Sequence, residues 1–533
     1  MAAIHGCRAK PCPPEAPPVN KGAYFMIRDI VWKTGQRFVA GFEGTTVPEN
    51  FKELVRKHKV GNVILFKRNV ESAEQLKKLC DDLQALILAE TGLPAFITID
   101  REGGAVTRLP EECAITPCAM ALASTGNVEN AYQSGVITGK ELNAIGVNFD
   151  LAPVMDTNSN PRNPVIGVRS FGDQPETVAN YGCAMIRGLE ENVISCAKHF
   201  PGHGDTDVDS HLGLPVVDKS IEQLEACELI PFKAAAEAGV SAIMTTHILF
   251  PQIEKDNVPA TMSKTIMQGI LREKLGFKGL IISDCMMMQA LATCYGTVPG
   301  ALAAIDAGVD LICICHDPKL TGEACENAAA KAEPEMMDRC VERIIAAKEA
   351  LLKHERHPMS VCTDPEALRN VQEQRAASVC MVGAEDVPPL GDKPFFVGCH
   401  PFHTSQAVDQ LSRFTGFTDY MQKELGGTSL VTPVLPGQKE IDEAVAAAQD
   451  ASCIVLCAYN AHIRRSQIDL MNALAATGKP LVVCAMGNPY DLSDLPEGAC
   501  GLTAFEYTVD MLKILKDVLT GAYKPVGTLS VKL

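Results

Sequence analysis

The 533-residue sequence contains no apolar run of about 18 residues, so it predicts no membrane-spanning helix. It also lacks an excess of basic side chains. The formal net charge is −17 at pH 7, which argues against nucleic acids and anionic membranes as partners. The N-terminus has no apolar signal core, and residues 1–22, with their prolines, predict a flexible tail. These absences favour a cytoplasmic globular protein, and they leave its oligomeric state open.

Cysteine usage points to the same compartment. The 21 cysteines are an odd number, and many stand inside apolar segments, where a thiol acts as a small hydrophobic group. We therefore expect a reducing environment and few or no disulfides. His5, Cys7 and Cys12 do not complete a four-ligand metal set. A glycine motif that would cradle phosphate is also missing, so no metal or cofactor is predicted.

The chain is longer than one hydrophobic core usually supports, which predicts two domains. Within residues 23–353, short apolar runs alternate eight times with polar breaks and helix-like segments such as 73–89 and 221–238. The eight runs are 37–42, 61–66, 95–99, 147–154, 193–197, 241–245, 280–283 and 311–315. This alternation predicts an α/β fold of the TIM-type (β/α)8 barrel class, closed by a helix over 342–353.

A second α/β pattern follows a predicted linker at 354–372. Over 373–533, apolar runs alternate with helix-like segments such as 439–448 and 468–476. The runs are 378–382, 395–397, 453–458, 481–486 and 501–507. Five or six strands alternating with helices predict a smaller doubly wound α/β sandwich.

Polar residues follow five of the eight runs in the first domain. They are Asp100, Asp156, Lys198 with His199, Thr246 with His247, and Asp284. In a TIM barrel the carboxyl ends of the strands form the active-site face. The placement of these residues therefore predicts one polar site at that end of the barrel.

The stretch after the fifth run is the densest in ionisable groups. Lys198-His199-Phe200-Pro201-Gly202-His203-Gly204 is followed by Asp209-Ser210-His211. With one residue between them, Asp209 could orient His211 and hold its proton, as the carboxylate of a catalytic triad does. The alternative is a hydrogen-bonded turn with a structural histidine.

Several stretches together resemble glycoside hydrolase family 3, in its bacterial β-N-acetylglucosaminidase branch. The loop just described resembles the family signature. The others are Ile99-Asp100-Arg101-Glu102-Gly103-Gly104-Ala105-Val106-Thr107-Arg108, Asn163 to Gly172 with Arg169, Pro259-Ala260-Thr261-Met262-Ser263, and Ser283-Asp284. The match covers the first domain, and the second domain is similar to the sandwich of some members more loosely. The sequence departs from the family pattern directly after Asp284, at Cys285-Met286-Met287-Met288.

The resemblance implies a retaining glycoside hydrolase that removes non-reducing terminal β-N-acetylglucosamine from small carbohydrates, such as cell-wall muropeptides or chitin-type fragments. Asp284 would be the nucleophile, and His211, oriented by Asp209, would be the general acid and then the general base. Substrate binding would fall to Asp100, Arg108, Arg169, Lys198 and His199. No cofactor or metal is implied.

Two other enzymatic functions remain open. A phosphorylase could use the same residues, because a neutral His211 would not repel an incoming phosphate as a carboxylate base would. A metallohydrolase could use His199, His203, His211, Asp205 and Asp209, since imidazole and carboxylate are good zinc or iron ligands. Barrel metal sites usually draw their ligands from several strands, whereas these five candidates lie within thirteen residues.

Overall fold

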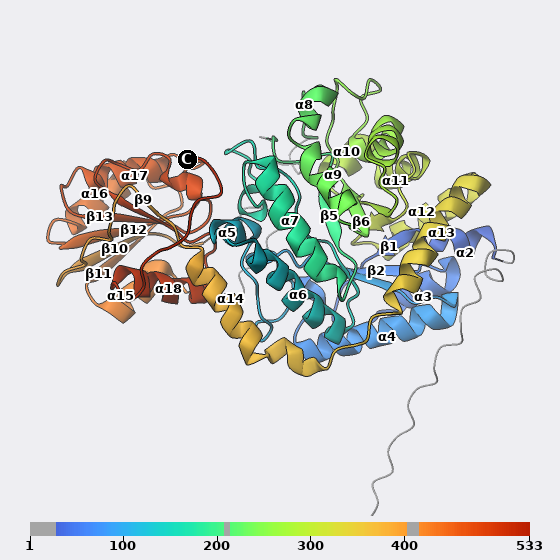
Figure 1. The fold of residues 1–533 in the computed structure, drawn as a ribbon, viewed down its shortest axis with the longest axis horizontal. Coiled ribbons are helices and arrows are strands. Elements are labelled where there is room, and N and C mark those ends of the chain that lie inside the picture. Colours follow the sequence, from blue (N-terminus) through green and yellow to red (C-terminus); the bar gives the residue numbers. More distant parts are fainter. Residues whose placement is uncertain (1–27, 207–213, 402–414) are drawn as a thin grey trace, which may run out of the picture.

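The computed structural model describes residues 28–206, 214–401 and 415–533. It confirms a barrel followed by an α/β sandwich (Figure 1). The barrel strands are β1 (Phe38–Ala40), β2 (Asn62–Leu65), β3 (Phe96–Ile99), β4 (Phe149–Asp150), β5 (Cys196–Phe200), β6 (Ala242–Thr245), β7 (Leu280–Ser283) and β8 (Ile312–Ile314).

The barrel closes through parallel pairing in chain order. Ladders join β4-β3-β2-β1-β8 and β5-β6-β7. Single bridges complete the ring, from Phe149 to Ile194 and from Val154 to Lys198 between the fourth and fifth strands, and from Ile282 to Leu311 between the last two. Because all the strands are parallel, their carboxyl ends meet on one face.

Helices cover the outside of this barrel, as the apolar strands require. They are α2 (Ile30–Gly35), α3 (Glu49–His58), α4 (Ala73–Thr91), α5 (Ala119–Ser124), α6 (Val128–Ile145), α7 (Pro175–Glu190), α8 (Ile221–Glu225), α9 (Leu229–Glu237), α10 (Gln289–Tyr295), α11 (Thr297–Asp306), α12 (Pro318–Lys331) and α13 (Pro334–Leu351). A π-helical segment, Thr265–Lys274, packs among them.

Two local predictions are corrected by the structure. The fifth strand begins and ends three residues later than predicted, because Lys198 and His199 are buried and paired with carboxylates and so continue the strand. The helix predicted over 221–238 is two helices. Pro231 stands in the first turn of α9, where its missing N–H costs nothing, whereas inside one continuous helix it would remove a hydrogen bond.

The amino-terminal end of the barrel holds a fully buried lysine. Lys348 Nζ donates to Gln36 Oε1 at 3.1 Å and to the carbonyl of Gly61 at 3.0 Å, and it lies 5.2 Å from the ring centroid of Phe96. Burial lowers the pKa of Lys348 to about 7. Burying the charged form of Lys348 therefore lowers the free energy of unfolding.

This burial predicts pH-dependent stability. Between about pH 7 and the ordinary lysine pKa of about 10.4, the unfolded chain binds this proton more tightly than the folded chain, so the contribution of Lys348 to stability should rise with pH. The wild-type Tm minus that of Lys348→Met should grow by about 2–5 °C from pH 7 to pH 10. The exposed Lys353→Met variant is the control, and its Tm difference from wild type should not change with pH. If the Tm difference for Lys348→Met were also independent of pH, the lowered pKa of the buried lysine would be contradicted.

The second domain is built on a six-stranded sheet. Its order is β11-β10-β12-β13-β14-β9, parallel except for β9 against β14. The strands are β9 (Met381–Val382), β10 (Pro394–Cys399), β11 (Thr428–Thr432), β12 (Cys453–Ala458), β13 (Leu481–Ala485) and β14 (Cys500–Thr503), and the helices are α15 (Phe417–Leu425), α16 (Gln438–Ala447), α17 (Ser466–Ala475) and α18 (Val509–Leu519). The edge strand β11 escaped the sequence analysis because only one of its five residues is buried and its apolar stretch is just two residues long.

The connection between the domains is structured. The stretch predicted as a linker, 354–372, contains a short 3-10 helix, Met359–Thr363, and the first part of α14 (Pro365–Ala377), which runs along the junction in Figure 1. An apolar cluster also joins the two domains. It combines Cys118, Met120 and Ala121 of the barrel with Cys380, Tyr490, Phe505 and Val531 of the sandwich. The sandwich is therefore packed against the barrel beside the loops after β3 and β4.

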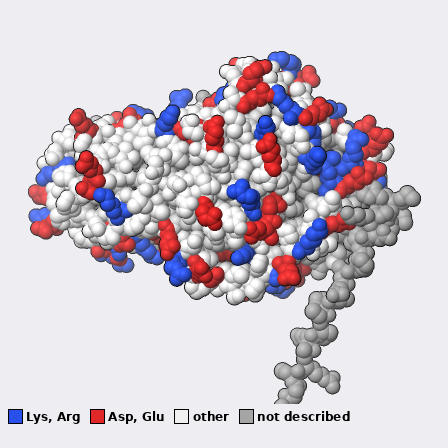
Figure 2. Space-filling view, viewed as in Figure 1, with Lys and Arg blue, Asp and Glu red and all other residues white. Residues whose placement is uncertain are grey.

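The surface carries charges of both signs. Figure 2 shows basic and acidic side chains interspersed on the face in view, without a field of one sign. Within the described ranges, no helix is both long enough and apolar enough to cross a bilayer.

Candidate active site

A cavity of about 170 Å³ opens at the carboxyl ends of the barrel strands. The predicted site residues that line it are Asp100, Arg108, Arg169, Lys198, His199 and Asp284. They come from the ends of β3, β5 and β7 and from the loops after β3 and β4. Asp209 and His211 lie outside the described residues. The preceding Thr206 shares a hydrogen bond of 2.9 Å with Nδ1 of His203, which lines the cavity.

A buried lysine forms the centre of the charged network. Lys198 Nζ lies 2.8 Å from Asp100 Oδ1 and 2.6 Å from Glu102 Oε1. Burial by itself would lower the pKa of Lys198, but the two carboxylates outweigh it and raise the pKa above its ordinary value. Lys198 is therefore a permanent cation in the cavity wall.

Glu102 links this lysine to an arginine. Arg169 donates through Nε to Glu102 Oε2 at 2.7 Å and through Nη2 to Oε1 at 2.8 Å, a bidentate pair. Burial would raise the pKa of Glu102, but Arg169 and Lys198 outweigh it and hold the pKa well below its usual range. Glu102 was missed as a site residue. The sequence feature that could have identified it is its position two residues after Asp100 and directly before the Gly103-Gly104 pair.

Asp100 and Arg108 complete the polar side of the cavity. Arg108 Nη2 is 3.6 Å from Asp100 Oδ2, and the Arg108 backbone has a φ of 54°. A positive φ in a residue with a long side chain is uncommon and is often found at functional sites. This wall thus presents guanidinium and ammonium donors beside carboxylate acceptors, a combination suited to hydroxyl groups, which both donate and accept.

His199 is held in place by a second buried carboxylate. Its Nδ1 lies 2.7 Å from Asp156 Oδ2, and Asp156 Oδ1 accepts the amide of His203 at 2.7 Å. Burial would raise the pKa of Asp156, but His199 and His203 outweigh it and lower the pKa. The ring of His199 is therefore fixed through Nδ1, which leaves Nε2 as the nitrogen that can contact a ligand. The role of Asp156 as an anchor was not assigned from the sequence.

Asp284 stands at the end of β7 and is half-buried in the same cavity. Its Oδ1 accepts the amide of Cys285 at 2.7 Å. Burial would raise the pKa of Asp284, but His199, His247 and the Cys285 amide outweigh it and lower the pKa. An ionised carboxylate without a proton to give is suited to act as a nucleophile.

His247, in the segment directly after β6, supports this end of the site. Its Nδ1 lies 2.9 Å from Thr261 Oγ1 and its Nε2 lies 3.1 Å from the carbonyl of Cys285. Burial lowers the pKa of His247 and outweighs the neighbouring Asp284 carboxylate, which would raise it. Nδ1 is thus held by the Thr261 hydroxyl, and Nε2 holds the backbone carbonyl next to Asp284. The position of His247 at a strand end was evident in the sequence, but its supporting role was not.

Among residues 28–206, 214–401 and 415–533, no group of three or more histidine, cysteine, aspartate or glutamate side chains is arranged to hold a metal ion. The described members of the metallohydrolase set have other partners. His199 and His203 bond to Asp156 and Thr206, and Asp205 pairs with Lys219 at 2.8 Å. Nothing in their arrangement favours metal chemistry.

The fold and site together define a (β/α)8-barrel protein with an ionised aspartate at the strand ends, beside donors and acceptors suited to a ligand rich in hydroxyl groups. The sequence profile of the glycosyl hydrolase family 3 N-terminal domain matches residues 31–347. The chain therefore belongs to glycosyl hydrolase family 3.

Relatives of known name agree with this assignment. Beta-hexosaminidase A of Pseudoalteromonas piscicida is 39% identical over 291 residues, which are 50% of this chain and 48% of that protein. A beta-hexosaminidase of Thiobacillus denitrificans is 36% identical over 287 residues, 52% of this chain and 78% of that one. This chain thus matches about half the length of the first relative and most of the second.

A solved structure covers both domains. A glycoside hydrolase family 3 beta-N-acetylglucosaminidase from Paenibacillus sp. str. FPU-7 superposes with a TM-score of 0.87 at 34% identity. The superposition covers 95% of this chain and 99% of that chain. The barrel and sandwich therefore occur together in that relative.

Proposed function

We propose that this protein is a retaining β-N-acetylglucosaminidase that removes a terminal, non-reducing sugar through a covalent glycosyl-Asp284 intermediate. The observation that carries the proposal is an ionised Asp284 in the same small cavity as the Asp100, Lys198 and Arg169 network. The relatives named beta-hexosaminidase and beta-N-acetylglucosaminidase support the choice of sugar.

The mechanism needs one carboxylate near the anomeric carbon and one proton-transfer group near the leaving oxygen. Asp284 attacks the anomeric carbon as the bond to the leaving group breaks. We assign the proton transfer to His211, oriented by Asp209, on the sequence alone, since both lie outside the described residues. An imidazole can protonate the leaving oxygen and then accept a proton from water, because its pKa lies near 6.5.

The remaining residues bind the sugar. Asp100 accepts hydrogen bonds from hydroxyl groups, and Arg108, Arg169 and Lys198 donate to hydroxyl or acetamido oxygens. His199 contributes the ring nitrogen left free by Asp156. Because these groups are held by one another before substrate arrives, little reorganisation is needed when the sugar binds.

The test is a comparison of chromogenic β-glycosides. The p-nitrophenyl β-N-acetylglucosaminide should be hydrolysed with a kcat/KM at least about 100-fold above those of the glucoside and xyloside, because losing a recognised amide costs several kcal/mol. The product should initially have the β configuration, which NMR can detect. Preference for the glucoside, or an α product, would reject the proposal.

The acceptor that releases the sugar should be water in most turnovers. A neutral His211 would also permit phosphate to attack, because two unit charges about 4 Å apart repel by about 4 kcal/mol at an effective dielectric of 20 and a carboxylate base would impose that penalty. We expect free sugar as the main product in several millimolar phosphate, with a measurably faster release. Chromatography that finds mainly sugar 1-phosphate would make the protein a phosphorylase.

We place the enzyme in the cytoplasm, acting on muropeptide or chitin-type fragments, with peptidoglycan recycling as one setting. The support is cysteine usage. All nineteen cysteines in the described ranges are free, and most are buried. Free thiols in such number suit a reducing compartment.

A further inference from the structure

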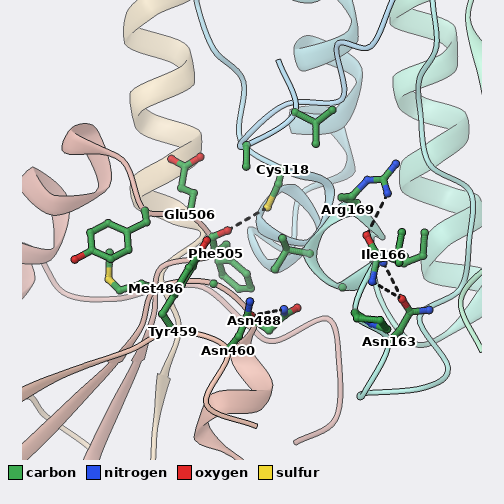
Figure 3. Close-up of a pocket in the computed structure, with 18 of the residues that line it drawn as sticks. Cys118, Asn163, Ile166, Arg169, Tyr459, Asn460, Met486, Asn488, Phe505 and Glu506 are labelled. Atoms are coloured by element: carbon green, nitrogen blue, oxygen red, sulfur yellow. Dashed lines mark hydrogen bonds between the residues drawn. The ribbon is translucent and has the colours of Figure 1, made fainter. Parts of the chain in front are cut away.

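The sandwich domain reaches the loop that carries Arg169. A cavity of about 150 Å³ lies between the domains, lined by the 163–169 segment of the barrel and by loops of the sandwich that follow β12, β13 and β14 (Figure 3). Arg169 and Val165 also line the catalytic cavity. This segment is therefore a shared wall, with the sugar site on one side and the sandwich on the other.

A chain of hydrogen bonds crosses this wall. In the sandwich, the hydroxyl oxygen of Tyr490 accepts a hydrogen bond from Asn158 Nδ2 at 3.0 Å. Asn158 Oδ1 in turn accepts the backbone amide of Gly167 at 3.2 Å. Tyr490 is 2% exposed and Asn158 is 1% exposed, so water does not compete for either bond.

The turn that receives this bond is the one that ends at Arg169. Gly167–Arg169 forms a single 3-10 turn, closed by the Ser170 amide donating to the Gly167 carbonyl at 3.1 Å. Because the turn is short, the position of the Gly167 amide sets the direction in which Arg169 leaves the backbone.

The sandwich also constrains the turn by direct contact. Gly167 has a φ of +45°, and a Cβ added to it would lie 2.6 Å from Asn488 Oδ1. Asn488 is itself held by donating to Asn460 Oδ1 at 3.0 Å (Figure 3). The second domain therefore contacts the turn from one side and, through Asn158, holds its amide.

From Arg169 the contacts continue to the sugar-binding network. Its bidentate pair fixes Glu102, which lies 2.6 Å from Lys198 Nζ, and that ammonium pairs with Asp100. We propose that Tyr490 is a positioning residue of the active site: its hydroxyl, through Asn158 and the Gly167 turn, sets the orientation in which Arg169 meets the sugar. The inference rests on the proposed function for the identity of that sugar.

The geometry separates this role from simple packing. The ring of Tyr490 is buried in the apolar interdomain cluster, whereas its bond to Asn158 is made by the hydroxyl alone. Tyr490→Phe keeps the ring and removes only the bond. It leaves a buried amide donor without a partner, and that donor can be satisfied only if Asn158 and the turn shift.

The experiment measures steady-state kinetics with p-nitrophenyl β-N-acetylglucosaminide. Tyr490→Phe should raise KM about tenfold while kcat changes less than about twofold, because Arg169 contacts the sugar in both the ground state and the transition state. A purely structural role would lower Tm and the active fraction, hence the apparent kcat, and leave KM unchanged. Tyr507→Phe is the matched control. The Tyr507 hydroxyl accepts a hydrogen bond from the Phe417 amide at 2.7 Å within the sandwich. Removing that hydroxyl should lower Tm without changing KM.

A second variant breaks the same chain on the barrel side. Asn158→Ala should raise KM to a similar degree. The KM of the double variant should not exceed that of the more impaired single variant, because both changes interrupt one path. Additive effects on KM, or an unchanged KM in both single variants, would overturn the inference. Wild-type protein that fails to hydrolyse this substrate would reject the proposed function instead. In that case, hydrogen exchange of the 163–172 amides decides the inference, with faster exchange in Tyr490→Phe expected and unchanged exchange against it.

Discussion

Asp284→Asn should lower kcat by at least about 1,000-fold on every substrate, a loss of about 4 kcal/mol or more of transition-state stabilisation. The amide keeps the size of the carboxylate and its acceptor for the Cys285 amide, so the fold and sugar binding should persist. What is lost is the anion that attacks the anomeric carbon. Steady-state kinetics, with sugar binding followed by calorimetry, check both halves of the expectation.

The matched control for this variant is Asp205→Asn. Asp205 belongs to the glycine-rich loop after β5, but its carboxylate pairs with Lys219 instead of lining the cavity. Its replacement should leave kcat within about threefold of wild type, as expected for a partly exposed ion pair. If Asp284→Asn kept more than about a tenth of the wild-type rate, Asp284 would not be the nucleophile.

His211→Ala should divide substrates by their leaving groups. A nitrophenolate departs as a stable anion and needs little protonation, so its release should slow only slightly. The alkoxide of a second sugar needs a proton, and its release should slow by about 100- to 10,000-fold. Asp209→Ala should show the same trend more mildly. A series of aryl and alkyl glycosides, plotted against the pKa of the leaving group, measures this division.

His203 supplies the control for that series. It lines the same cavity, but burial lowers its pKa to about 4, so it holds no acidic proton at neutral pH. His203→Gln should therefore affect good and poor leaving groups alike. Equal losses across the series in His211→Ala would reassign that residue to substrate binding, and a steep dependence in His203→Gln would make His203 the acid.

The barrel could be predicted because its evidence is local. Each strand is a short run apolar on both faces, and the polar residues that follow such runs must gather at one end of a parallel barrel. Asp100, Lys198, His199 and Asp284 were placed together by that rule, and their cavity confirms the placement. The family resemblance added Arg108 and Arg169, which stand in loops where periodicity carries no signal.

Pairing between charged groups could not be predicted from the sequence. Glu102 and Asp156 are ionised although they are buried, because Arg169, Lys198 and His199 are folded against them from elements 43 to 96 residues away in the chain. Composition shows which charges exist, but the energy of a charge depends on its distance to a partner and on the water around it. The extension of β5 through Lys198 and His199 has the same origin.

The sequence by itself determined the fold class, the end of the barrel at which the chemistry is located and the residue types available there, since strand periodicity and strand ends are properties of neighbouring residues. Only the tertiary structure decided which charges are neutralised and what the second domain contacts. Tyr490 and Gly167 are 323 positions apart, yet Asn158 joins them through two hydrogen bonds. Such contacts depend on how the sandwich packs on the barrel, and no local pattern records that packing.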